Sequence, residues 1–75
     1  MESIGDILVA SENNLKEIGK DINKNGKPSD ETLDQANEIL KRLNTEANEN
    51  TEDPMASIIN EMINLYQKVL DEYKK

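Results

Sequence analysis

Residues 54–73 read PMASIINEMINLYQKVLDEY, and their apolar side chains recur in alternating steps of three and four. This spacing places them on one side of an α-helix, because an α-helix turns once every 3.6 residues. The stripe consists of Met55, Ile59, Met62, Tyr66, Val69 and Tyr73. It is flanked by Ile58 and Leu65 on one side and by Ile63 and Leu70 on the other. The apolar sector of this helix is therefore wide.

Two further stripes with the same spacing precede it along the chain. The first consists of Ile4, Leu8, Ser11, Leu15, Ile18 and Ile22, and the second of Leu33, Ala36, Leu40, Leu43 and Ala47. Amphipathic helices joined by short loops pack antiparallel and bury their stripes against one another. The sequence therefore predicts an all-α fold: a small up-down-up three-helix bundle, one domain over residues 1–75, with helices at about 3–23, 30–47 and 54–73. Self-association through the third helix remains open.

Polar residues mark the expected helix ends. A capping side chain accepts a backbone N–H that the first turn leaves free. The expected caps are Ser3 with Asp6, Ser29 or Asp30, and Asp53 before Pro54. Asn25 and Gly26 tolerate left-handed backbone angles, and Pro28 cannot continue a helix. We therefore expect the first helix to end near Ile22 or Asn23.

The composition argues against an enzyme. The chain contains no His or Cys, so the usual activated nucleophiles and thiolate or imidazole metal sites are missing. Its three glycines are isolated, which excludes a phosphate-binding glycine loop. We expect no catalytic residue, no cofactor and no bound metal. The sequence shows neither a secretory signal nor an apolar run of the roughly 20 residues that cross a bilayer, so we expect a cytoplasmic protein.

The negative charge is concentrated in the middle of the chain. The net charge is −7, and residues 29–53 hold eight acidic residues against Lys41 and Arg42, which accounts for −6 of it. Nucleic acids and anionic membranes bind basic surfaces. Direct binding to either is therefore disfavoured, and a partner protein with a basic surface is favoured.

Asp34 and Glu38 lie beside the apolar stripe of the second expected helix. One interpretation is a solvated face that also complements the helix dipole. The other is a docking patch for a basic groove, in which the carboxylates act as a nucleic-acid mimic. The sequence leaves both open.

Asp21-Ile22-Asn23-Lys24-Asn25-Gly26 is similar to the first half of an EF-hand calcium loop, with oxygen ligands at positions one, three and five and Gly at six. Position twelve, normally a bidentate Glu, is Thr32. A degenerate calcium loop over residues 21–32 is therefore an alternative to an ordinary turn between helices.

The wide sector of the third helix has two explanations: the helix touches both others, or Ile63 and Leu70 stay partly exposed as a docking strip. The tyrosines fit either explanation, because tyrosine fills cores and also favours interfaces. The candidate protein-binding residues are Ile59, Ile63, Tyr66, Leu70, Tyr73, Asp34 and Glu38. We expect a small acidic protein-binding module that acts on a larger protein as inhibitor, adaptor or assembly factor, with a homodimer as a variant. Its composition suits a bacterial or phage accessory protein.

Overall fold

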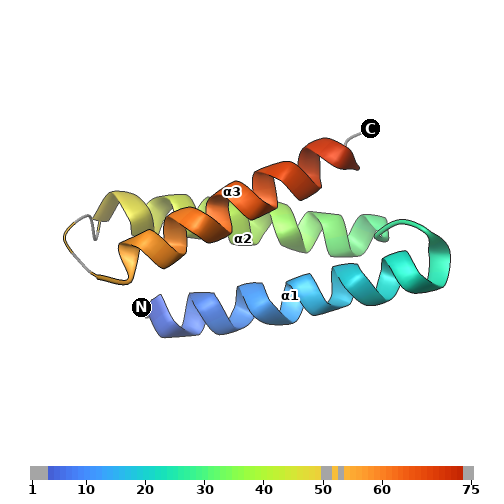
Figure 1. Ribbon diagram of the computed structural model, residues 1–75, viewed down its shortest axis with the longest axis horizontal. Helices are drawn as coiled ribbons and strands as arrows, with labels where there is room; N and C mark the ends of the chain where they lie inside the picture. The colour runs from blue at the N-terminus through green and yellow to red at the C-terminus, as the bar shows by residue number, and fades with distance from the viewer. Residues whose placement is uncertain (1–3, 50–51, 53, 74–75) are drawn as a thin grey trace.

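Three helices follow one another in an up-down-up arrangement (Figure 1). A computed structural model describes residues 4–49, 52 and 54–73. The helices are α1 (Ile4–Asn25), α2 (Asp30–Glu49) and α3 (Ala56–Glu72). α2 packs against both α1 and α3, so it is the central helix. The predicted three-helix bundle is confirmed. Within the described residues, no helix is long and apolar enough to span a bilayer.

The core draws on all three helices. Its buried apolar residues are Ile7, Ile18, Ala36, Ile39, Leu43, Ile59, Ile63 and Tyr66. Several residues that the stripes placed at the centre, among them Leu8, Leu15 and Leu40, are only partly buried and pack at the edge of this cluster. Each apolar stripe is wider than the strip of helix surface that contacts the neighbouring helices. Which residues of a stripe become fully buried therefore depends on how the neighbouring helices pack against it.

The turn between α1 and α2 is built on Gly26. α1 runs to Asn25, two or three residues beyond the expected end, and the Gly26 N–H donates to the Ile22 carbonyl at 2.8 Å. Gly26 has φ of 82°, which glycine adopts without strain and which stops the helix. Pro28 is buried in the turn. Ser29 caps α2, because its Oγ accepts the Thr32 N–H at 3.2 Å.

The other helix ends differ from expectation or fall outside the described residues. α2 continues to Glu49, two residues past the predicted end. α3 begins at Ala56, so Pro54 precedes the helix and Met55 occupies the N-cap position without a side-chain cap. The expected caps at Ser3 and Asp53 lie outside the described residues.

A polar network crosses the core and joins all three helices. The Tyr66 hydroxyl lies 2.9 Å from the Ser11 carbonyl oxygen and 3.0 Å from Asn14 Oδ1, so its one proton is shared between two acceptors on α1. Asn14 Nδ2 in turn donates to the Thr32 carbonyl of α2 at 3.4 Å. Tyr66 is fully buried, and this burial raises the pKa of its hydroxyl. α3 is thus tied to α1 by one side chain.

Candidate functional site

A groove runs between α2 and the C-terminal half of α3. Its volume is about 670 Å³, and its floor is apolar. The floor consists of Leu33, Leu40, Leu70 and Tyr73. These side chains are all partly buried, so each still presents apolar surface to the groove. We call this feature the α2–α3 groove.

The floor is apolar because it is formed by the flanks of two stripes. Leu33 and Leu40 are seven residues apart on α2, which places them on one side of that helix. Leu40 and Leu70 pack against the edge of the core. One side of each of these leucines thus contacts the core, and the other side faces the groove.

Carboxylates lie at one end of this floor, where α2 begins and α3 ends. Asp30 and Asp34 contribute from the first turns of α2 and Asp71 from the last turn of α3, with the amides of Asn37 and Gln67 between them. None of the described residues that line the groove is basic. The two acids of α2 also complement the positive end of the helix dipole. The same residues can therefore stabilise the helix start and give the groove a negative rim.

The structure corrects the predicted docking strip. Ile59 and Tyr66 are fully buried and Ile63 is 8% exposed, so these three residues belong to the core and cannot contact a partner in the folded monomer. Leu70 and Tyr73, which the sequence grouped with them, line the α2–α3 groove instead. The prediction that Ile63 stays partly exposed beside Leu70 is therefore wrong.

The two acidic candidates are separated. Asp34 lines the α2–α3 groove and also borders a shallower hollow between α1 and α2. Glu38 lines that second hollow beside Arg42 and is not part of the α2–α3 groove. Asp34, Leu70 and Tyr73 are thus the predicted residues that the structure brings together, and Glu38 faces a different side.

The large apolar residues that stay exposed are on other surfaces. Ile58 is 42% and Leu65 43% exposed on α3, and Val9 is 57% exposed on α1. The flank of Ile58 and Leu65 was visible in the sequence as one edge of the wide sector. Which edge would remain exposed depended on how α3 turns toward α1, and the sequence pattern does not contain that information.

The calcium-loop interpretation does not fit the backbone. Residues 21–25 belong to α1, so Asn23 leaves the helix on the side opposite to Asp21 and Asn25, and the three side chains do not surround an ion. Among the described residues, no group of three or more acidic side chains is placed to hold a metal. The backbone of residues 21–25 is therefore that of a helix and not that of a calcium loop.

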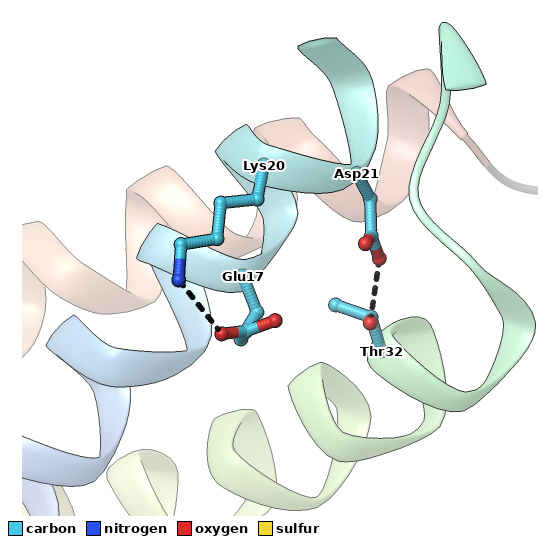
Figure 2. Close-up of polar contacts among 4 residues, drawn as sticks. All are labelled: Glu17, Lys20, Asp21 and Thr32. Carbon is cyan, nitrogen blue, oxygen red and sulfur yellow. Dashed lines mark hydrogen bonds and ion pairs between the residues drawn. The ribbon is translucent and has the colours of Figure 1, made fainter. Parts of the chain in front are cut away.

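Asp21 instead ties α1 to α2 (Figure 2). Its carboxylate accepts the Thr32 hydroxyl at 2.7 Å, as the figure shows. The same carboxylate also accepts the Ser29 N–H at 3.1 Å. The hydrogen bonds from Thr32 and then Ser29 lower the pKa of Asp21, because they stabilise the charged form. The ion pair between Glu17 and Lys20, 3.6 Å apart in the same view, is exposed and contributes little to stability.

Comparison of the chain with protein-family models, with curated proteins and with solved structures finds no match. The functional argument therefore rests on the surfaces described above.

Proposed function

We propose that this chain is a non-enzymatic protein-binding module that docks on a larger protein through the α2–α3 groove, as an inhibitor, adaptor or assembly factor. The observation that carries the proposal is an apolar floor with the carboxylates of Asp30, Asp34 and Asp71 at one end. Such a groove suits a segment with large apolar side chains flanked by Lys or Arg. The apolar side chains supply affinity and the charges supply orientation and association rate.

The size of the groove favours a short segment over a broad interface. Each Leu-sized anchor that becomes fully buried contributes about 1.5–3 kcal/mol. Two anchors contribute about 3–6 kcal/mol, and after the cost of ordering the segment this corresponds to dissociation constants on the order of millimolar. The partner segment would therefore bind reversibly.

The floor also separates this proposal from the nucleic-acid mimic. A mimic presents carboxylates in the positions of successive phosphates, and a basic nucleic-acid groove gains little from leucines between them. Here the acids lie at one end of a groove whose floor includes Leu33, Leu40 and Leu70. This arrangement supports a protein segment as the ligand.

Fluorescence anisotropy with two labelled synthetic helical peptides tests the proposal. One peptide carries leucines on one face and lysines on the other, and the second replaces every Lys by Glu. We expect the Leu/Lys peptide to bind with an affinity that falls as salt rises, because exposed charges are screened. The Leu/Glu peptide should bind at least about tenfold more weakly.

Matched variants assign the binding to the groove. Asp34→Asn with Asp71→Asn, and separately Leu33→Ala, should each weaken the Leu/Lys peptide. Glu17→Gln with Glu49→Gln makes the same change in net charge at exposed positions outside the groove and should leave binding within about twofold. Equal loss in both double variants would mean that net charge alone attracts the peptide, and the groove would be rejected.

A further inference from the structure

The two ends of the α2–α3 groove differ in charge. The groove follows α2 from Asp30 to Leu40 and α3 from Tyr73 back to Gln67. α3 runs antiparallel to α2 and ends beside the start of α2 (Figure 1). The carboxylates at this shared end are those of Asp30, Asp34 and Asp71. We call it the acidic end, and we call the opposite end, near Leu40 and Gln67, the neutral end.

The negative charge disappears within two helical turns. Residues seven apart lie on the same side of a helix. Seven residues from each acid, toward the neutral end, the chain carries an amide or a lysine. The pairs are Asp30 with Asn37, Asp34 with Lys41, and Asp71 with Asn64. All six side chains are exposed, so the same helix sides change from three negative charges to one positive charge.

The helix dipoles do not offset this difference. The start of α2 carries the positive end of its dipole and the end of α3 carries the negative end of its own, so the two oppose each other at the acidic end. Dipole effects fade within the first or last turn, and the neutral end lies further inside both helices. The side chains therefore set the charge pattern of the groove.

The groove has the length and the floor for a short helix. Its floor comes from Leu33 and Leu40 on α2 and from Leu70 and Tyr73 on α3, so a helix that lies between them contacts both walls. The distance along α2 from Asp30 to Leu40 is about 15 Å at 1.5 Å per residue, or roughly ten helical residues. Amphipathic helices bind in apolar grooves of this kind through anchors on one face.

We propose that the α2–α3 groove holds its partner helix in one orientation, with the partner's Lys or Arg side chains at the acidic end and its uncharged polar side chains at the neutral end. This inference rests on the proposed function, because it concerns the ligand of the same groove. A basic side chain at the acidic end lies near Asp34 and Asp71, whereas at the neutral end it meets the like charge of Lys41. The partner is thus an amphipathic helix whose positive charge is confined to one end.

Two peptides of equal composition separate this pattern from simple charge attraction. Both are acetylated and amidated, and both carry the same leucines on one face and the same number of lysines. One peptide has all its lysines at one end, and the other has them spread along the polar face. In an NMR titration of the full chain, we expect the first to bind about threefold more tightly, because none of its lysines meets Lys41 and each exposed charge pair is weak.

Nitroxide labels report the orientation itself. The peptide with lysines at one end carries a nitroxide either at that basic end or at its other end, and it is added at millimolar concentration to the ¹⁵N-labelled full chain. We expect the label at the basic end to broaden residues 30–34 and 70–73 most strongly. The label at the other end should broaden residues 37–44 and 60–67. Equal broadening of both groups by either label would overturn the single orientation.

An exchange of two charges on α2 tests the cause of the orientation. Asp34→Lys with Lys41→Asp leaves the net charge at −7, takes the acidic end from −3 to −1 and takes the neutral end from +1 to −1. Both labels should then broaden both groups about equally. Glu17→Lys with Lys20→Glu is the matched control, because it exchanges an exposed acid and an exposed lysine on α1 outside the groove, and it should keep the wild-type pattern. A wild-type pattern in the α2 exchange would contradict the proposal.

The orientation and the docking proposal fail in different ways. Shift changes in residues 30–40 and 67–73 without a preferred orientation would reject the orientation and leave docking in the groove intact. Absence of shift changes in these residues would reject docking, and the orientation with it. Circular dichroism compares the helix content of each variant with that of the wild type. The labelling of the wild type decides the orientation even if an exchange variant fails to fold.

Discussion

Replacing Tyr66 by Phe removes one oxygen atom from the centre of the bundle and leaves the ring in place. The Tyr66 hydroxyl serves two acceptors at 2.9 and 3.0 Å, the Ser11 carbonyl and Asn14 Oδ1. The carbonyl also belongs to the backbone ladder of α1, whereas Asn14 Oδ1 is a buried side-chain acceptor that would lose this donor. A buried acceptor without a donor costs about 1–3 kcal/mol. We expect the variant to lose that amount of unfolding free energy.

Urea unfolding followed by circular dichroism measures this loss. A core in a chain of this size supplies only about 3–5 kcal/mol, so the variant should be visibly less stable, with a Tm lower by about 4–8 °C for each kcal/mol. The slope of unfolding free energy against urea should not change, because the buried surface is the same. Tyr73→Phe is the control, since Tyr73 is only partly buried at the end of α3. Equal stability of Tyr66→Phe and the wild type would refute the idea that this hydroxyl anchors α3.

The raised pKa of Tyr66 makes the unfolding free energy depend on pH. Burial raises the pKa of Tyr66 above that of the unfolded chain, so the folded state favours the neutral phenol. This contribution is fully present below about pH 10, the ordinary tyrosine pKa, and is lost as the pH rises through the higher pKa of the folded state. Stability should therefore fall above about pH 10, and it should fall less steeply in Tyr66→Phe.

Two predictions concern the helices and their connection. Gly19→Ala should raise the unfolding free energy by about 0.5–1 kcal/mol in thermal melts, because a Cβ there meets no atom within 4 Å and alanine favours the helix; Gly26→Ala should lower it, because φ is 82° there. Asp21→Asn should lower the urea midpoint at pH 7, because hydrogen bonds lower the pKa of the Asp21 carboxyl in the folded state. The stability that the Asp21 carboxylate contributes is present above about pH 3.9 and is lost as the pH falls through the folded-state pKa. A midpoint difference that persists unchanged at pH 2 would exclude this role for the charge.

Periodicity was sufficient to predict the three helices, their order and their antiparallel packing. It was not sufficient to predict which line of each stripe would be buried. Asn14 and Thr32 enter the interior because Tyr66 and Asp21 supply their hydrogen bonds, and those partners are distant in sequence. A pattern that counts apolar residues assigns such positions to the surface. Ser11, which the first stripe did include, packs where α3 approaches α1.

The candidate sites show the same limit. Leu70, Tyr73 and Asp34 were each chosen on their own helix, but their meeting in one groove depends on how α3 crosses α2. Ile63 was chosen on the same grounds and is buried, because the helix turns that flank toward α2. The calcium interpretation failed because Gly26 ends α1 only after Asn25, so the supposed ligands became helical. The sequence thus identified useful residue types, and the packing decided their roles.

The most direct test of the central claim is a map of the peptide footprint by ¹H–¹⁵N NMR. The labelled wild-type chain is titrated with the unlabelled Leu/Lys peptide at a fixed protein concentration, and shift changes are assigned residue by residue. We predict that the largest changes cluster in residues 30–40 and 67–73, on both sides of the α2–α3 groove. Changes centred on Leu8, Leu15, Ile58 and Leu65, or spread evenly over all exposed carboxylates, would contradict the claim that this groove is the binding site.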